Sequence, residues 1–324
     1  MSIPAHEKYF AAIDMGTNSF HLIIVEKKKN DSFKIVDRER KVIRLGSDSK
    51  DDFKFISPEE SKKALDILFG FKNLSNKYKA KIRAVATSAV REAQNKNEFI
   101  KTVLKETGIV VEIIEGNHEA KLIFQGAKEA LNLHNKKVLC IDIGGGSTEI
   151  ILGNNGEPIF AESIKIGAVR MSKKYFPEYA LSNKALIECE KFIEHQIISN
   201  KNISFNKDFE ITVGASGTIQ STASIIRSRL KEENNKSLNG FSFNEIQLRE
   251  ITREILEAKN LQERQKIKGI DKKRADILPA GLIILNKIFD LFNLKNITIS
   301  EYALREGVIL EMIEEDEKES EKIF

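Results

Sequence analysis

A short pattern that occurs twice constrains the fold of this chain more than any other feature. The pattern I-D-x-G-x-x-S-x-x-[LI] begins at Ile13 and again at Ile141, 128 residues further on. This spacing is too long for a solenoid, in which repeats recur about every 20 to 50 residues. In both copies an apolar run leads into the aspartate and another follows the serine, as in two strands joined by a turn. The repeat predicts two related domains that each open with such a hairpin; chance similarity of two hairpins is the alternative.

Length and element pattern agree with two α/β domains. The chain has 324 residues, 41% of them hydrophobic, which is longer than a usual single domain and apolar enough for two cores. Ser57, Pro58 and Glu60 form a helix-start signature of N-cap serine, proline and capping glutamate. We expect strands at residues 9–15, 19–27, 33–44, 81–87 and 109–114, and a second sheet from Val138. We expect helices from residue 58 and at 91–108, 117–131, 183–198, 216–231, 273–292 and 302–313, followed by a frayed acidic end. Such alternation is typical of an α/β sheet.

The second copy of the pattern contains a glycine-rich turn suited to an anion. No lysine and no helix follow its glycines, which excludes a Walker loop. A turn of this kind directs several backbone N–H groups to one point. Asp142 and Glu149 flank the turn, and two carboxylates beside a phosphate indicate a divalent cation. A plain hairpin with solvated acids is the alternative. The candidates for binding phosphate through the turn are Gly144, Gly145, Gly146 and Ser147.

A third glycine-rich segment, Glu210 to Ile226, has the pattern of a buried strand, a turn and a helix. The turn is Gly214-Ala215-Ser216-Gly217. Free N–H groups at a helix N-terminus attract anions, which the helix dipole reinforces. The segment is therefore a further candidate phosphate site, and an ordinary strand-to-helix connection is the alternative.

Charge, hydropathy and cysteine content exclude several classes of function. A net charge of +4 is too mildly basic to indicate nucleic-acid binding. No apolar run is long enough to span a membrane, and the N-terminus lacks the features of a signal peptide, so we expect a cytoplasmic protein without a membrane partner. Cys140 and Cys189 are too few and too far apart for a disulfide framework or a zinc site.

Seven segments, in order along nearly the whole chain, resemble those of the exopolyphosphatase and guanosine pentaphosphate phosphohydrolase family. This family lies within the actin, sugar-kinase and heat-shock-chaperone ATPase superfamily. The segments are IDMGTNSFHL, VIRLG, ATSAVREAQN, EIIEGNHEAKLIFQG, IDIGGGSTEI, TVGASGT and RADILPAG.

The resemblance implies an α/β fold of two ribonuclease-H-like domains with an active-site cleft between them. The implied domains are residues 1–122 and 123–301, with a C-terminal helix at about 302–324 that packs back on the first domain. The chain resembles a short form of the family, without the C-terminal helical domain of longer relatives. Relatives often dimerise, so a homodimer is an open expectation.

The resemblance also implies roles for individual residues. Glu119 takes the place of the catalytic base, although a first-turn glutamate favoured by the helix dipole is the alternative. Asp142 and Glu149 are expected to be catalytic and, with Asp14, to bind Mg²⁺ or another divalent cation. His21 either touches substrate or sits beneath the loop, and a surface arginine is the alternative for Arg91. The further candidates for binding substrate phosphate are Thr17, Asn18, Ser19, His21, Arg91, Gly214, Ser216, Gly217, Arg264 and Arg274.

The implied activity is Mg²⁺-dependent hydrolysis of a terminal phosphoanhydride. The substrate is inorganic polyphosphate or guanosine pentaphosphate, and the sequence leaves the two open. A non-catalytic sensor of polyphosphate or guanosine tetraphosphate is the rival from another class. The presence of Glu119, Asp142 and Glu149 favours the hydrolase, because a sensor has no need of an acid that activates water.

Overall fold

The protein comprises two compact α/β units in the computed structural model, which describes residues 8–28, 32–46, 54–201, 203, 208–230 and 237–321. Unit 1 is Met1–Glu115 with Leu304–Phe324, and unit 2 is Gly116–Ala303. The sequence predicts divisions after residues 122 and 301, a few residues from these. Helix α4 (Gly116–Leu131) lies wholly in unit 2 because it packs on that unit's strands.

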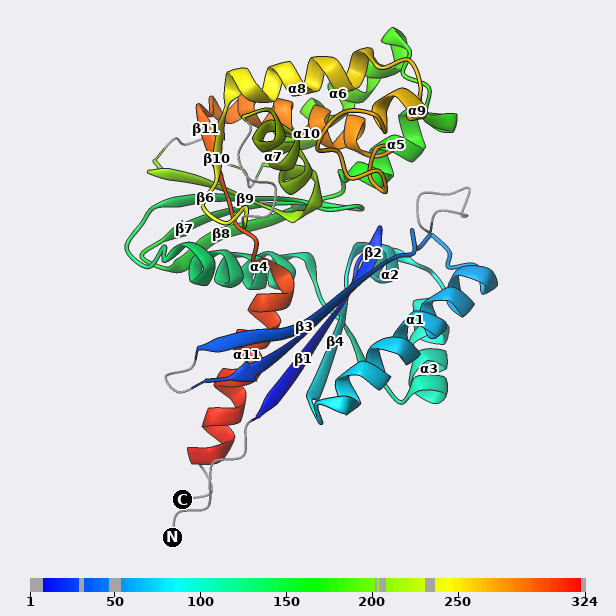
Figure 1. Ribbon diagram of the computed structural model, residues 1–324, viewed down its shortest axis with the longest axis vertical. Coiled ribbons are helices and arrows are strands. Elements are labelled where there is room, and N and C mark those ends of the chain that lie inside the picture. The colour runs from blue at the N-terminus through cyan, green and yellow to red at the C-terminus, as the bar shows by residue number, and fades with distance from the viewer. Residues whose placement is uncertain are drawn as a thin grey trace. The chain divides into compact units, whose positions relative to one another are not determined.

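Unit 1 is built on a five-stranded mixed sheet with the strand order β3-β2-β1-β4-β5. Strands β1, β2 and β3 form an antiparallel meander, and β4 and β5 run parallel to β1. Helix α11 packs on β1 and β2 on one face, and α1 covers the other face beside α3 (Figure 1). The elements are β1 (Tyr9–Met15), β2 (Ser19–Lys27), β3 (Phe33–Val42), α1 (Pro58–Lys77), β4 (Lys81–Ala86), α2 (Ser88–Glu92), α3 (Lys96–Thr107), β5 (Val111–Ile113) and α11 (Leu304–Glu321).

Unit 2 is built on a six-stranded mixed sheet with the order β10-β11-β9-β6-β7-β8. Helix α4 covers one face, against β7 and β8, while α7 and α10 cover the other (Figure 1). Besides α4, the elements are β6 (Val138–Ile143), β7 (Thr148–Asn154), β8 (Glu157–Ile164), α5 (Ala168–Tyr175), the 3-10 helix η2 (Pro177–Tyr179), α6 (Asn183–Ile198), β9 (Ile211–Ala215), α7 (Ser216–Arg229), β10 (Ser242–Asn244), α8 (Glu245–Glu257), α9 (Leu261–Arg264), α10 (Leu278–Phe292) and β11 (Asn296–Ile299).

The two sheets repeat one plan, as the sequence pattern predicts. Strands β1 and β6 each pair antiparallel with the next strand and parallel with a later one, β4 or β9. Asp14 lies opposite His21 in the first hairpin, and Asp142 lies opposite Glu149 in the second. The prediction of two related α/β domains is confirmed, because both sheets carry the pattern at the same position.

The predicted helix start at Ser57 is also confirmed. The Ser57 hydroxyl accepts a hydrogen bond from the Glu60 amide at 3.1 Å, and Glu60 Oε2 accepts one from the Ser57 amide at 2.9 Å. This capping box satisfies two amides at the first turn of α1, whose N–H groups have no partner within the helix.

The helix predicted at 91–108 is wrong, because two helices, α2 and α3, occupy this segment. The chain leaves helical geometry at Ala93, and the Asn95 side chain then bonds both backbone groups of Ile56, at 2.9 and 3.0 Å. Local propensity favours one continuous helix here, but these tertiary hydrogen bonds stabilise the break.

Two other helix ends differ from the prediction. Helix α10 begins at Leu278 and not at residue 273, with Pro279 in its first turn, where a proline needs no hydrogen-bond partner. The acidic end predicted to fray is helical as far as Glu321. Its carboxylates pair with cations on or next to the strands of unit 1: Asp316 with Lys8, Glu317 with Lys27, and both Glu311 and Glu315 with Arg83. Among the residues that the structure describes, no helix combines the length and apolarity that a bilayer crossing requires.

Candidate active site

The glycine turn between β6 and β7 is held from one side by helix α5. Amides of the first turn of α5 donate to the carbonyl oxygens of Gly144 and Gly145 at 2.9 to 3.1 Å, and Arg170 Nε donates to the Gly146 carbonyl at 2.7 Å. This approach requires glycine at position 167, where an added Cβ would lie 2.4 Å from the Gly145 oxygen. The turn is therefore fixed by contacts to its carbonyl groups.

These contacts determine where the amides of the turn point. In a planar trans peptide the C=O and N–H bonds point in opposite directions. Because the carbonyls of residues 144 to 146 face α5, the N–H groups of Gly145, Gly146 and Ser147 point away from it. Three consecutive amides on one side of a turn match the anion-binding arrangement that the sequence predicts.

Three buried carboxylates gather beside this turn. Asp142 and Glu149 are directly opposite in the β6/β7 register, so their side chains share one face of the sheet. Glu119, in the first turn of α4, is close enough to act electrostatically on Glu149. All three are buried, with exposed fractions of 6% for Glu119 and Asp142 and 1% for Glu149. The structure thus brings together, within unit 2, the three residues predicted to be catalytic.

Burial raises the pKa of the Glu149 carboxyl well above its ordinary value, and the negative charges of Glu119 and Asp142 raise it further. Hydrogen bonds from Ser163, at 2.7 Å, and from Ser147 act in the opposite direction by stabilising the carboxylate. Desolvation and like charges both disfavour a second or third negative charge in one place. The cluster therefore retains a proton on Glu149 or takes up a compensating cation.

The two predicted metal ligands that lie in unit 2 fit Mg²⁺. Among the described residues, no group of three or more histidine, cysteine, aspartate and glutamate side chains has the arrangement of a metal site. Mg²⁺ commonly keeps several waters and takes only one or two protein carboxylates. The opposed pair Asp142 and Glu149 is a donor set of that kind, and its excess negative charge suits a cation. Asp14, the third predicted ligand, lies in unit 1 at the end of β1.

The third glycine segment differs from the prediction. Gly214 and Ala215 belong to strand β9, and helix α7 begins directly at Ser216, so no separate four-residue turn exists. Ser216 makes the change of direction with a φ of 71°, a left-handed conformation that is uncommon for a residue with a side chain. Its hydroxyl donates to the Ile143 carbonyl at 3.0 Å, which ties the start of α7 to the end of β6.

Arg274 lies over this helix start. A Cβ added to Gly217 would fall within 1.9 Å of the Arg274 guanidinium, so only glycine leaves room for it. Asp271 is near the same arginine, with 3.8 Å between Nε and the carboxylate. The structure therefore places Arg274 beside Ser216 and Gly217, three residues predicted to bind phosphate.

Arg264 has a different environment. Its side chain is fully buried and donates to the Tyr179 carbonyl at 2.8 Å. Burial lowers the pKa of its guanidinium, and the negative charge of Asp276 acts against this shift. Nε and one terminal nitrogen are buried without a hydrogen-bond partner among the described residues. Such groups are costly to bury, so their donors are suited to an anion.

In the corresponding turn of unit 1, Thr17 and Asn18 stand where the turn of unit 2 has two of its glycines. Thr17 and Asn18 are buried, and the hydroxyl of Thr17 and both polar atoms of the Asn18 amide have no hydrogen-bond partner among the described residues. The Asn18 carbonyl accepts from the amides of Ile43 and Arg44 at 3.1 Å, which fixes the backbone of the turn. Buried polar atoms without partners are rare in native structures and mark a position where a ligand fits.

His21 and Ser19 lie next to this turn and contact each other. Ser19 Oγ is 2.8 Å from His21 Nε2, and the other ring nitrogen, Nδ1, is 3.3 Å from a terminal nitrogen of Arg305 on α11. Both ring nitrogens of His21 therefore face protein groups, and Ser19 shares its hydroxyl with the imidazole.

Arg91 is anchored within unit 1 by a backbone carbonyl. It lies in the last turn of the short helix α2, and its guanidinium donates to the Ile114 carbonyl at 2.8 Å. Its side chain is only half-buried, so the structure leaves its phosphate-binding role as a prediction.

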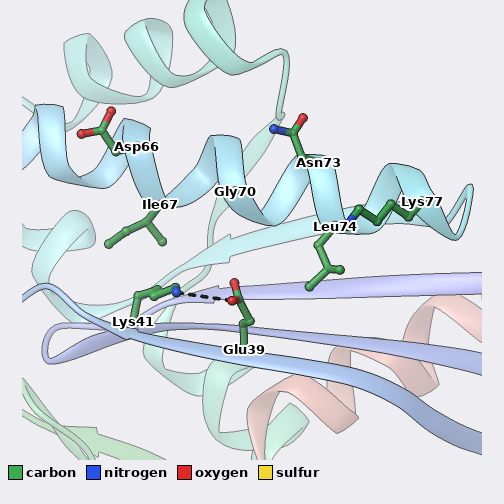
Figure 2. Close-up of a pocket in the computed structure, with 8 residues that line it drawn as sticks. All are labelled: Glu39, Lys41, Asp66, Ile67, Gly70, Asn73, Leu74 and Lys77. Carbon is green, nitrogen blue, oxygen red and sulfur yellow. Dashed lines mark ion pairs between the residues drawn. The ribbon is translucent and has the colours of Figure 1, made fainter.

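Figure 2 shows a groove on unit 1 whose lining contains none of the predicted site residues. It has a volume of about 460 Å³, is widely open and lies between strand β3 and helix α1. Its walls carry both signs of charge, including a Lys41–Glu39 ion pair of 3.3 Å. The carboxylate cluster belongs to unit 2, and none of its three residues lines this groove.

Two arginines, one bonded to the turn of unit 2 and one beside the turn of unit 1, were not predicted from the sequence. Arg170 holds the Gly146 carbonyl, and Arg305 contacts His21. The sequence signal for Arg170 is a glycine followed by a short helix directly after a strand, at Gly167. Arg305 has no comparable signal, because 284 residues separate it from His21.

Comparisons with known proteins identify the family of this chain. A family model described as the Ppx/GppA phosphatase family matches residues 23–316. An exopolyphosphatase from Cytophaga hutchinsonii is 28% identical, with a TM-score of 0.86 over 95% of this chain and 98% of that one. The Ppx/GppA family member from Aquifex aeolicus is 25% identical, with a TM-score of 0.79 and the same coverage. The chain therefore belongs to the Ppx/GppA phosphatase family of phosphoanhydride hydrolases, as the sequence predicts.

Proposed function

We propose that the protein is an Mg²⁺-dependent exopolyphosphatase, which hydrolyses the terminal phosphoanhydride of inorganic polyphosphate and releases orthophosphate. The observation that carries the proposal is the cluster of Glu119, Asp142 and Glu149 beside the amides of the glycine turn. Hydrolysis needs a positioned water, an acceptor for its proton and donors for the phosphoryl oxygens. The cluster and the turn supply groups for each of these tasks within one unit.

In this proposal each group of the turn region has one task. The amides of Gly145, Gly146 and Ser147 bind oxygens of the reacting phosphate, because they point away from α5 as a set. Glu119 accepts the proton of the attacking water, and Asp142 and Glu149 hold the cation. When bound, Mg²⁺ neutralises charge on the phosphoryl oxygens.

The remaining candidates bind phosphates of the substrate. Ser216, Gly217 and Arg274 lie together, and the Arg274 guanidinium provides the planar donor fork that suits phosphate. Thr17 and Asn18 provide buried polar atoms that have no hydrogen-bond partner in the part of the chain that the structure describes. Guanosine pentaphosphate is the alternative substrate, because it presents the same terminal phosphoanhydride.

The test measures phosphate release by the purified protein with Mg²⁺, using long-chain polyphosphate, short-chain polyphosphate, guanosine pentaphosphate and ATP in separate assays. We expect the highest kcat/KM with polyphosphate and a loss of about 100-fold or more in Glu119→Gln, because general bases contribute on this scale. Glu129→Gln is the matched control: Glu129 is exposed on the same helix α4, and we expect its replacement to leave the rate unchanged.

The other outcomes discriminate among the alternatives. Preference for guanosine pentaphosphate would replace polyphosphate as the substrate and leave the roles of the carboxylates intact. Binding of polyphosphate or guanosine tetraphosphate with no turnover of any substrate would favour a sensor and overturn the role of Glu119. Equal rates of the Glu119→Gln and Glu129→Gln variants would overturn that role as well.

A further inference from the structure

We propose that Arg305 is a positioning residue of the phosphate-binding turn in unit 1: it fixes the tautomer of His21 and thereby directs the Ser19 hydroxyl hydrogen to a substrate phosphate. The proposal rests on the proposed function in one respect, that this turn binds phosphate. It assigns a task to the start of α11, a part of the chain that has no role in the proposed action of the three carboxylates.

The contacts form a chain of three side chains. Arg305 approaches His21 Nδ1 at 3.3 Å, and His21 Nε2 lies 2.8 Å from Ser19 Oγ. Arg305 lies in the first turn of α11, with the buried Glu306 carboxylate 3.7 Å from its guanidinium. Helix α11 packs on β1 and β2, the strands that flank the turn, so the helix determines where the guanidinium lies.

The chemistry of the arginine determines the direction of each hydrogen bond. A guanidinium has only donors and stays protonated, so His21 Nδ1 must accept. A neutral imidazole that accepts at Nδ1 carries its proton on Nε2, which then donates to Ser19 Oγ. The hydroxyl has one hydrogen of its own, and because Oγ already accepts from His21 it uses that hydrogen to donate elsewhere.

The surroundings of Ser19 indicate what receives this hydrogen. Ser19 is buried and directly follows Thr17 and Asn18, whose buried polar atoms have no partner among the described residues. The Thr17 hydroxyl and the Asn18 amide nitrogen are further donors in the same turn. A phosphate, whose oxygens only accept, satisfies this set of donors, whereas a cation does not.

The first test reads the tautomer of His21 directly by NMR of protein labelled with ¹⁵N-histidine, at a pH where imidazoles are neutral. The chain has five histidines, and His21→Gln identifies the His21 signals. We expect Nε2–H with an unprotonated Nδ1 in the wild type and in Arg305→Lys, which keeps a cationic donor. We expect a mixture of both tautomers in Arg305→Met. Arg83→Met is the matched control, because Arg83 also binds α11 but contacts Glu311 and Glu315 at a distance from His21.

The second test measures binding of tripolyphosphate by calorimetry, with KM and kcat beside it. Arg305→Met is expected to weaken binding by about three- to tenfold, the factor of one hydrogen bond, with kcat changed less than KM. Ser19→Ala should show the same loss, and the double variant no further loss, because both changes remove one hydrogen bond. Arg305→Lys should recover most of the affinity, and Arg83→Met should bind like the wild type.

Three results would overturn the proposal. An unchanged tautomer in Arg305→Met would show that the arginine does not select it. A wild-type His21 with its proton on Nδ1 would reverse the direction of the chain. Fully additive losses in the double variant would show that Arg305 does not act through Ser19. A wild-type protein that hydrolyses no substrate would contradict the proposed function alone, since the tautomer and the tripolyphosphate affinity are measured without turnover.

Discussion

The environment of Glu149 departs strongly from that of an ordinary carboxylate. Burial and the charges of Glu119 and Asp142 raise its pKa, so between the ordinary and the raised value the folded protein binds a proton that the unfolded chain does not. Stability therefore falls as pH rises through that interval. Below the ordinary pKa of glutamate, both states are protonated and the effect vanishes.

This linkage predicts that Glu149→Gln stabilises the protein while abolishing hydrolysis. In EDTA at neutral pH, the free energy of unfolding should rise by about 1.4 kcal/mol for each pH unit from the ordinary pKa of glutamate up to the raised pKa, or up to the working pH where that is lower. The gain should disappear at a pH below the ordinary glutamate pKa. Urea unfolding of both proteins across the pH range measures it, and a variant less stable than the wild type at neutral pH would contradict the prediction.

The residues of the site differ in how far the sequence reveals them. Asp142 and Glu149 flank one turn in the sequence, and antiparallel pairing places them opposite each other, so their proximity was predictable. Arg170 and Arg305 reach the turns through α5 and α11, whose docking depends on tertiary packing. A sequence motif contains residues that are close together along the chain, whereas each of these two contacts joins residues that are far apart in the sequence.

At the scale of elements, the prediction from the sequence was wrong about the connection between β9 and α7, which follow each other directly. The glycines suggested a loop, whereas one left-handed residue, Ser216, turns the strand into the helix. The continuous apolar strands β1 and β2 were predictable because their run of apolar residues is by itself enough to indicate a strand. The break between α2 and α3 was not, because Asn95 stabilises it through the distant Ile56.

This junction predicts that Gly217→Ala impairs binding of phosphate without unfolding unit 2. The new methyl group would occupy the place of the Arg274 guanidinium, which is the end of a flexible side chain and can move away. We expect the affinity for tripolyphosphate to fall about tenfold, the scale of a lost charge-assisted hydrogen bond. Gly70→Ala is the control. Gly70 lies exposed in α1, and its new methyl group would have no neighbour within 4 Å among the described residues, so this change should raise stability by about 0.5 to 1 kcal/mol. Equal affinities of the two variants would show that Arg274 does not bind phosphate from this position.

The contacts of α11 predict a salt-dependent contribution to stability. Arg83 on β4 pairs with Glu311 and Glu315 of the helix, and all three side chains are partly exposed. Arg83→Met should therefore lower the free energy of unfolding of unit 1 by about 1 kcal/mol at low salt. The difference should shrink at about 1 M NaCl, where charges are screened within a few ångströms. Thermal unfolding at both salt concentrations measures it, and a loss that is equal at both would mean that packing and not charge is the cause.

At the scale of the whole molecule, the two units differ in how the chain builds them. Unit 2 is one continuous segment, whereas unit 1 needs residues from both ends of the chain. The repeated pattern predicted two related domains because both hairpins contain it. The return of the chain end to unit 1 came from the family resemblance, since no local pattern in α11 encodes its partner.

This construction predicts that a chain ending at Ala303 loses unit 1 but retains unit 2. The apolar residues of α11 that are buried against unit 1 include Val308, Ile309 and Met312. Each contributes about 1.5 to 3 kcal/mol, so their joint removal approaches the total stability of a typical domain. Peptide-resolved hydrogen exchange should show β1 and β2 unprotected and β6 and β9 still protected, while a chain ending at Glu321 should exchange like the full chain. Retained protection of β1 without α11 would show that the sheet of unit 1 is stable by itself, and α11 would then serve to place Arg305 beside His21 without being needed to hold the sheet together.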